Sequence, residues 1–219
     1  MRLDVVLTAL SFVLCVASNT LPRTRRFISG QGCFWGPQNR LSKLPGVNSC
    51  IAGYIGGSNM QPTYKSVCGG DGHFEAVQVV YDDSILSFKA LFENYLDYWR
   101  TKGSALPPKG SQYSPCLFVE SIEELEYARA AMTDNELKHH TIVLRNIDKH
   151  PFFSAEGWHQ NYEEKQRPRN VLLALGVFLD LWPGAPVSLH QTGAALTCFY
   201  IVVTLAERSL QNKVEKQLV

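Results

Sequence analysis

Alternating and helically spaced hydrophobic residues divide the chain into short strands and helices. Valine-rich or alternating segments predict strands at residues 27–29, 47–54, 73–81 and 141–147. Apolar residues at helical spacing predict helices at residues 35–44, 87–99, 121–137 and 155–165, with one further turn of helix at 64–67. Strands that alternate with helix-length connections predict an α/β or α+β sandwich, in which helices pack against one mixed sheet.

Polar residues mark where two of these helices begin. Ser87 precedes the apolar positions of the 87–99 segment and is a typical N-cap residue. Ser121 and Glu124 have the spacing of a capping box at the start of the 121–137 segment. The residues from Lys102 to Ser114 are polar and rich in glycine and proline, which predicts a loop between the two helices.

The first residues are typical of a targeting segment. Arg2 is followed by an apolar run from Val5 to Val16 and by the small residues Ala17 and Ser18. This pattern predicts a signal peptide at residues 1–18 and entry into the secretory pathway, with the endoplasmic reticulum or the exterior as destination. An uncleaved N-terminal strand or anchor is the alternative. The arginines of residues 23–26 also allow a plastid destination through a bipartite leader.

The last fifty residues differ in character from the rest of the chain. We assign residues 26–166 to one catalytic domain and residues 167–219 to a divergent C-terminal tail. Two apolar runs lie in this tail, at Val171–Leu181 and Ala194–Ala206. Both are shorter than the roughly 18 residues that a membrane-spanning helix needs. The tail is therefore expected to form a buried helix or a helix on a membrane surface.

Composition excludes several classes of protein. The formal net charge is +1 and 45% of the residues are hydrophobic, which is ordinary for a globular domain of 219 residues. The few clustered arginines do not make a nucleic-acid-binding surface, so no nucleic-acid partner is expected. The chain is also expected to be a monomer. Six cysteines are too few for a disulfide-built scaffold. Their spacing with the histidines does not match a zinc site, so no metal is expected.

A lone cysteine between glycines and aromatic residues is the strongest candidate for chemistry. Gly32, Cys33, Phe34, Trp35 and Gly36 follow a short strand and open a predicted helix. A helix N-terminus stabilises a thiolate, the nucleophilic form of cysteine. Phe34 and Trp35 can line an apolar pocket beside it. The alternative is a buried packing cysteine in a tight turn with two core aromatic residues.

Three further polar residues can serve such a thiol. Glu75 lies in a valine-rich strand, where apolar surroundings would raise its pKa and make it a proton donor near neutral pH. A glutamate that faces solvent from a half-buried strand is the alternative. Tyr64 and Tyr113 lie beside loops rich in glycine and proline, and their phenols can donate hydrogen bonds to an oxygen of a substrate. Each can equally be a rim or core tyrosine.

Five motifs follow one another between Phe27 and Tyr162: GCFWG, GYIGG, PTYKSVCGGDGHFEAVQVVYD, GSQY and AEGWHQNY. In this order they resemble the A-type peptide methionine sulfoxide reductases. The resemblance implies a two-layer α+β sandwich with a ferredoxin-like core. It also implies that Cys33 attacks the sulfur of a methionine S-sulfoxide, free or in a protein. No cofactor is implied.

The resemblance assigns a role to each residue around the attacking cysteine. Phe34 and Trp35 would hold the substrate's methyl group, while Glu75 would protonate the sulfoxide oxygen. Tyr64 and Tyr113 would donate hydrogen bonds to that oxygen. Methionine then leaves, and the cysteine remains as a sulfenic acid. A second thiol condenses with it to form a disulfide, which thioredoxin or another dithiol reduces.

Some positions depart from the family pattern. Pro108 stands where the family usually has an aspartate, and Ser114 where it usually has an arginine. A non-catalytic or weakly active secreted binding domain that retains the fold is therefore the alternative function. The resolving thiol also stays open: Cys68 and Cys198 are the preferred candidates, Cys116 is a third, and direct reduction by an external thiol is the last.

Overall fold

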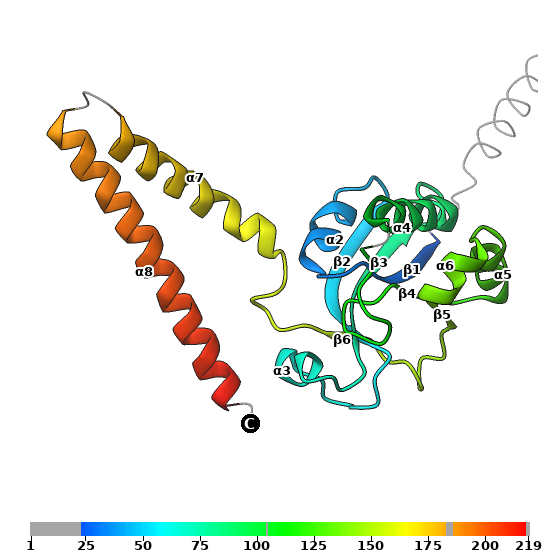
Figure 1. The fold of residues 1–219 in the computed structure, drawn as a ribbon. Coiled ribbons are helices and arrows are strands. Elements are labelled where there is room, and N and C mark those ends of the chain that lie inside the picture. Colours follow the sequence, from blue (N-terminus) through cyan, green and yellow to red (C-terminus); the bar gives the residue numbers. More distant parts are fainter. Residues whose placement is uncertain (1–22, 104, 183–185, 218–219) are drawn as a thin grey trace, which may run out of the picture.

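A computed structural model describes residues 23–103, 105–182 and 186–217 of the chain. The predicted signal peptide, residues 1–18, lies outside the described residues. The remainder forms one mixed sheet, a set of helices against it, and a long helical hairpin at the C-terminal end (Figure 1).

The sheet has the strand order β5-β4-β1-β3-β2-β6. All neighbouring strands are antiparallel except β4 and β5, which are parallel. The sheet is therefore mixed, as the sequence predicts. Its strands are β1 (Thr24–Gly30), β2 (Val47–Ile55), β3 (Phe74–Asp82), β4 (Cys116–Val119), β5 (Thr141–Leu144) and β6 (Phe153–Ser154).

The helices lie between and after these strands. They are α2 (Trp35–Leu41), α3 (Tyr64–Cys68), α4 (Phe88–Lys102), α5 (Ile122–Ala130), α6 (Asp134–His139), α7 (Tyr162–Leu181) and α8 (Val187–Gln217). Ser87 caps α4 as predicted, because its hydroxyl accepts a hydrogen bond from the backbone N–H of Ala90 at 3.2 Å.

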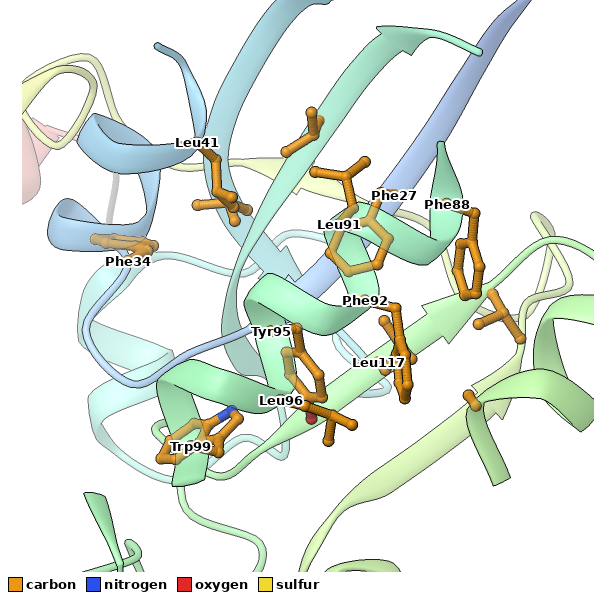
Figure 2. Packing of buried hydrophobic residues seen from close by; sticks show 14 of the residues in the cluster. Phe27, Phe34, Leu41, Phe88, Leu91, Phe92, Tyr95, Leu96, Trp99 and Leu117 are labelled. Carbon is orange, nitrogen blue, oxygen red and sulfur yellow. The ribbon is translucent and has the colours of Figure 1, made fainter. Parts of the chain in front are cut away.

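The main core lies between one face of the sheet and the helices α2, α4 and α5. Helix α4 directs Leu91, Phe92, Tyr95 and Trp99 into this core, where they are almost fully buried (Figure 2). A smaller cluster covers the opposite face of the sheet and consists of Ile28, Ile55, Ala76, Cys116 and Phe118. The two-layer α+β sandwich predicted from the sequence is thus confirmed.

Two helix predictions are wrong. The segment 121–137 forms two helices, because Thr133 starts a new helix: its hydroxyl accepts from the N–H of Glu136, whose carboxylate accepts from the N–H of Thr133. At the first helix, Ser121 accepts from the N–H of Glu124, but the Glu124 carboxylate accepts from Glu120 at 2.9 Å. Residues 155–161 form turns rather than a helix, which begins only at Tyr162.

The tail also differs from the sequence-based expectation. Helices α7 and α8 pack against each other as an antiparallel hairpin, and α8 continues to Gln217. Among the described residues, one segment is long and apolar enough to cross a membrane, Val187–Glu207 of α8, with 6% of its apolar window buried. The expectation that no run reaches spanning length is therefore wrong, and the helix is not buried. The predicted boundary at residue 166 falls inside α7.

Candidate active site

Cys33 lies in the turn between β1 and α2. Gly32 before it has φ of +72°, a conformation that residues with a side chain rarely adopt, and this turn places the thiol one residue before the N-cap of α2. Cys33 is exposed. However, partial burial among its neighbours raises the pKa of the thiol, and the backbone N–H of Trp35 offsets this only in part. The start of α2 thus stabilises the thiolate through the Trp35 N–H, but burial outweighs this effect in the free protein.

Glu75 lies on β3 and is 1% exposed, so the alternative of a solvent-facing glutamate is wrong. One carboxylate oxygen accepts a hydrogen bond from the backbone N–H of Phe34 at 3.2 Å, and the other accepts from the side-chain amide of Gln112 at 3.2 Å. Burial raises the pKa of Glu75 to about 7, although the Phe34 N–H opposes this. The carboxyl group therefore changes between its protonated and its ionised form near neutral pH, as predicted.

The carboxyl of Glu75 and the thiol of Cys33 influence each other. The negative charge of Glu75 is among the causes that raise the pKa of Cys33. A second carboxylate, Glu163 at the start of α7, acts in the same direction. Because each ionised group disfavours ionisation of the other, protonation of Glu75 favours the thiolate form of Cys33.

Cys68 lies in the same cluster of side chains as Glu75 and Gln112. The side-chain amide of Gln112 lies 3.6 Å from the sulfur of Cys68 and also donates to Glu75, so one amide bridges the two groups. Cys68 is the last residue of α3 and is exposed. The structure thus places this thiol beside the acidic residue.

Both predicted tyrosines face this cluster. Tyr64 is half-buried and Tyr113 is 37% exposed. Burial raises the pKa of both phenols; for Tyr64 a hydrogen bond with Cys68 comes next among the causes, and for Tyr113 the charge of Glu75 does. Both phenols therefore stay protonated and can donate hydrogen bonds near neutral pH.

Helix α3 is held in place by its own caps and by a neighbouring carboxylate. Thr63 and Ser66 form a capping box at its start. Asp71 then accepts hydrogen bonds from the Ser66 hydroxyl at 2.6 Å and from the backbone N–H of His73 at 3.0 Å. Since His73 directly precedes β3, this carboxylate fixes the helix that carries Tyr64 and Cys68 against the strand that carries Glu75.

Aromatic rings form the other side of the site. Phe34 is buried in the core and lies 5.2 Å from the ring of His159, while Tyr64 lies 4.6 Å from it. Trp35 is half-buried, and its indole N–H donates to Nδ1 of His159 at 3.2 Å. Tyr162 stacks on Trp35 with 3.7 Å between ring centroids. His159 is therefore a buried hydrogen-bond acceptor.

Two residues of the site, Gln112 and Glu156, were not predicted from the sequence. The side chains of Gln112 and Glu156 each make two hydrogen bonds there: Glu156 accepts from the Tyr54 hydroxyl and the Tyr64 N–H, both at 2.8 Å. Both residues stand inside motifs already noted, GSQY and AEGWHQNY. That position is the only signal that could have found them, because their partners lie more than thirty residues away.

The remaining cysteines lie in different surroundings. Cys116 is fully buried, burial raises its pKa to about 12, and its sulfur packs so closely on Gly30 that a side chain there would clash. It is therefore unsuited to resolve a sulfenic acid. Cys198 is exposed on α8, a helix whose main contact is with α7. The structure thus brings Cys68, but not Cys198, to the site.

The positions that depart from the family pattern meet in one loop. The hydroxyl of Ser114 donates to the carbonyl of Pro108 at 2.8 Å, and Ser114 is buried. Backbone hydrogen bonds from Ser111 to Pro108 and from Ser114 to Ser111 close the loop on itself. These replacements therefore support the loop that presents Gln112 and Tyr113. In the part of the chain that the structure describes, no group of three His, Cys, Asp or Glu side chains could hold a metal ion.

Comparisons with known proteins show the family of the chain. A sequence model of the family described as "Peptide methionine sulfoxide reductase" matches residues 25–177. Peptide methionine sulfoxide reductase MsrA of Shigella boydii is 36% identical over 152 residues, 63% of this chain and 69% of that protein. The MsrA/MsrB protein of Vibrio cholerae is 33% identical over 178 residues, 74% of this chain and 47% of that protein, so the chain spans about half of it.

Solved structures give the same result for the fold. Methionine sulfoxide reductase A of Corynebacterium diphtheriae has a TM-score of 0.56 and 23% identity, covering 68% of this chain and 77% of that one. Reduced Mxr1 from Saccharomyces cerevisiae has a TM-score of 0.51 and 27% identity, covering 66% and 86%. The family match covers more than half of the chain. This chain therefore belongs to the peptide methionine sulfoxide reductase family, on its A-type branch.

Proposed function

We propose that this chain reduces methionine S-sulfoxide, free or in proteins, to methionine, with Cys33 as the nucleophile and Glu75 as the proton donor. The observation that carries the proposal is the buried Glu75 carboxyl, which Phe34 N–H and Gln112 hold beside Cys33 and which has a pKa of about 7. A carboxyl group of this kind can deliver a proton to an oxygen that is becoming basic.

The chemistry follows from the polarity of the sulfoxide. Its sulfur is electrophilic once its oxygen is protonated or strongly hydrogen-bonded, because the S–O bond then breaks more easily. The Cys33 sulfur attacks, Glu75 supplies a proton to the oxygen, and the phenols of Tyr64 and Tyr113 donate hydrogen bonds to it. Overall, the oxygen atom passes from the substrate sulfur to the sulfur of Cys33. Methionine sulfoxide is reduced by two electrons to methionine, and the cysteine is oxidised by two electrons to a sulfenic acid.

The raised pKa of Cys33 is compatible with this scheme. The thiol–carboxyl pair holds one proton between the pH values at which its two members titrate. The reactive arrangement places that proton on Glu75 and leaves Cys33 as the thiolate. Burial is the largest cause of the raised thiol pKa, and repulsion by an ionised Glu75 adds to it; in this arrangement Glu75 is neutral, so that repulsion is absent.

We assign the recycling step to Cys68. Its thiol condenses with the sulfenic acid of Cys33, which forms a disulfide and releases water. A dithiol reductant such as thioredoxin then reduces that disulfide. Support comes from the exposed position of Cys68 and from Gln112, which joins it to Glu75.

The compartment of the mature protein is a separate part of the proposal. The pattern of residues 1–18 supports removal of a signal peptide and a place in the secretory pathway. N-terminal sequencing of the mature protein tests it: a first residue near Asn19 is expected, and retention of Met1 would contradict it.

The activity is tested with the full chain and separated substrate epimers. Purified protein with dithiothreitol should reduce the S epimer of a methionine sulfoxide peptide and leave the R epimer. Replacing the nucleophile in Cys33→Ser should lower the rate at least about 1000-fold. The matched control is Cys198→Ser, which removes another exposed thiol and should keep the rate within about twofold. Turnover that survives in Cys33→Ser would refute the assignment.

A further inference from the structure

The hairpin of α7 and α8 exposes many large apolar side chains. Elsewhere in the described chain such residues are scattered singly, for example Met60, Ile85 and Ile147. On the hairpin they fall into two groups, one along α7 to the start of α8 and one at residues 199–205 of α8. They are Val171, Leu175, Val177, Phe178, Leu181, Trp182, Val187, Phe199, Ile201, Val202 and Leu205. So many exposed apolar side chains on one pair of helices indicate an interaction site.

Charged residues are nearly absent from this surface. Between Asn170 and Ala206 the sequence contains one Asp, Glu, Lys or Arg residue, Asp180. Asp180 lies one residue before the end of α7, and its carboxylate lies against Gly193 of α8. At the other end of the hairpin, Arg169 of α7 pairs with Glu207 of α8. The apolar part is thus bounded at one end by an ion pair and contains one carboxylate, which packs between the two helices.

The length of α8 matches a bilayer. Its apolar segment, Val187–Glu207, has 21 residues. At 1.5 Å per residue this segment is about 30 Å long, which is the thickness of the hydrocarbon core. Phe199, Ile201 and Val202 project over an arc of about 160° around the helix axis. The exposed apolar surface is therefore wider than the narrow seam through which two helices pair.

Two threonine hydroxyls of the hairpin are hydrogen-bonded within their own helix. The hydroxyl of Thr192 donates to the carbonyl of Ser188, and that of Thr204 to the carbonyl of Tyr200, both at 2.8 Å. These hydroxyls find acceptors on the preceding turn of their own helix and need no solvent.

The two helices also approach each other closely at small residues. A side chain at Gly176 would come within 2.6 Å of the Thr197 hydroxyl, and one at Gly193 within 2.7 Å of the Gly176 carbonyl. Close contact through glycine and threonine is typical of helix pairs in lipid, where hydrophobic burial does not drive association.

We propose that the α7–α8 hairpin is embedded in a lipid bilayer, with α8 as its long arm, and anchors the reductase domain to that membrane. The observations that select lipid over a second copy of the chain are the length of α8, the wide exposed arc and the internally bonded hydroxyls. The proposal does not depend on the catalytic assignment.

Flotation with vesicles tests this proposal. The full chain, purified in detergent, is reconstituted with phosphatidylcholine vesicles and floated through a sucrose gradient in 1 M NaCl. Val202→Glu with Leu205→Glu places two charges on the exposed face of α8. The matched control is Ile85→Glu with Ile147→Glu, since these side chains are similarly exposed but lie on the sheet domain. Circular dichroism and melting temperature check that each variant is folded.

The expected result separates the two variants. The wild type and the Ile85/Ile147 control should float, and the Val202/Leu205 variant should show at least about tenfold less floating protein, because charged side chains are costly inside a bilayer. Since every protein in the test keeps residues 1–18, that segment cannot explain a difference. Equal flotation of all three would overturn the proposal. So would a wild type that stays at the bottom as a dimer in light scattering, because a second copy would then cover the hairpin.

Discussion

Two sides of the candidate site differ in how they are built. One side is polar: Glu75, Gln112 and Cys68 are joined through a single amide, and the two phenols face them. The other side is aromatic and consists of stacked rings around His159. The polar side holds groups that change their charge or bonding during the proposed reaction. The aromatic side holds groups that do not change, so it can contribute binding but little to the chemical step.

This difference predicts different kinetic effects. Interactions that strengthen only in the transition state control kcat, whereas interactions present equally in the bound substrate control KM. Substitutions on the polar side should therefore lower kcat, and substitutions on the aromatic side should raise KM. The predictions below test that separation.

The largest effect is expected from the acid. Glu75→Gln keeps a side chain that can accept from the Phe34 N–H but removes the proton donor. We expect kcat to fall roughly 100-fold with little change in KM, since proton donation contributes to the transition state. The matched control is Glu163→Gln, which removes the other carboxylate charge near Cys33 and should retain most of kcat. An unchanged kcat in Glu75→Gln would exclude the proton-donor role.

The pH dependence of kcat/KM tests whether Glu75 and Cys33 share one proton in the reactive state. Below about 7 both Glu75 and Cys33 are protonated, and above the raised pKa of Cys33 neither is. The reactive state with one proton lies between, so kcat/KM should rise about tenfold per pH unit up to about 7 and fall again above the pKa of the thiol. In Glu75→Gln, alkylation of Cys33 by iodoacetamide should show a lower thiol pKa, because the neighbouring charge is gone. A thiol pKa that does not move would show that the two groups are not coupled.

Recycling should depend on one of the two exposed thiols other than Cys33. Cys68→Ser should lower thioredoxin-coupled turnover about tenfold, while the first turnover, measured as one methionine formed per protein, stays near normal. Cys198→Ser should leave both unchanged. Mass spectrometry after one turnover should detect a Cys33–Cys68 disulfide in the wild type. A Cys33–Cys198 disulfide in its place would reverse this assignment.

The smallest effect is expected on the aromatic side. Tyr162→Ala removes the ring stacked on Trp35, and such a stack contributes about 0.5–1.5 kcal/mol. We therefore expect KM to rise about two- to tenfold with kcat nearly unchanged. Tyr162→Phe is the control, because it keeps the ring and should behave like the wild type. A loss of kcat in Tyr162→Ala would break the proposed separation between the two sides.

Local sequence patterns predicted much of the fold, and the predictions that were wrong or missing have physical causes. The strands β2 and β3 and the capped start of α4 follow from alternation, glycines and Ser87. Strand β4 was not predicted, because all four of its residues are buried and a short apolar run lacks alternation. The division of the 121–137 segment was missed although Thr133 and Glu136 have the spacing of a capping box.

Some residues of the site could also be predicted from the sequence, and others could not. Cys33 and Glu75 could be proposed because their own neighbours in sequence define their surroundings. The bridge from Gln112 to Cys68 could not, because it depends on how the loop before β4 folds against α3. The hairpin was misjudged for a similar reason: the polar residues between the two apolar runs hide that α8 begins at Val187 as one continuous helix.

Tyr162 belongs to two structures at once, since it is the ring that covers Trp35 and also the first residue of α7. Anything that tilts α7 must also shift this ring, and a substrate that settles against Trp35 must in turn favour one tilt of the helix. The two equilibria are thermodynamically linked, so each changes the other by the same factor. The energy of one stacked pair limits that factor to about tenfold. The tail can therefore tune the affinity of the reductase for its substrate without touching the reacting atoms.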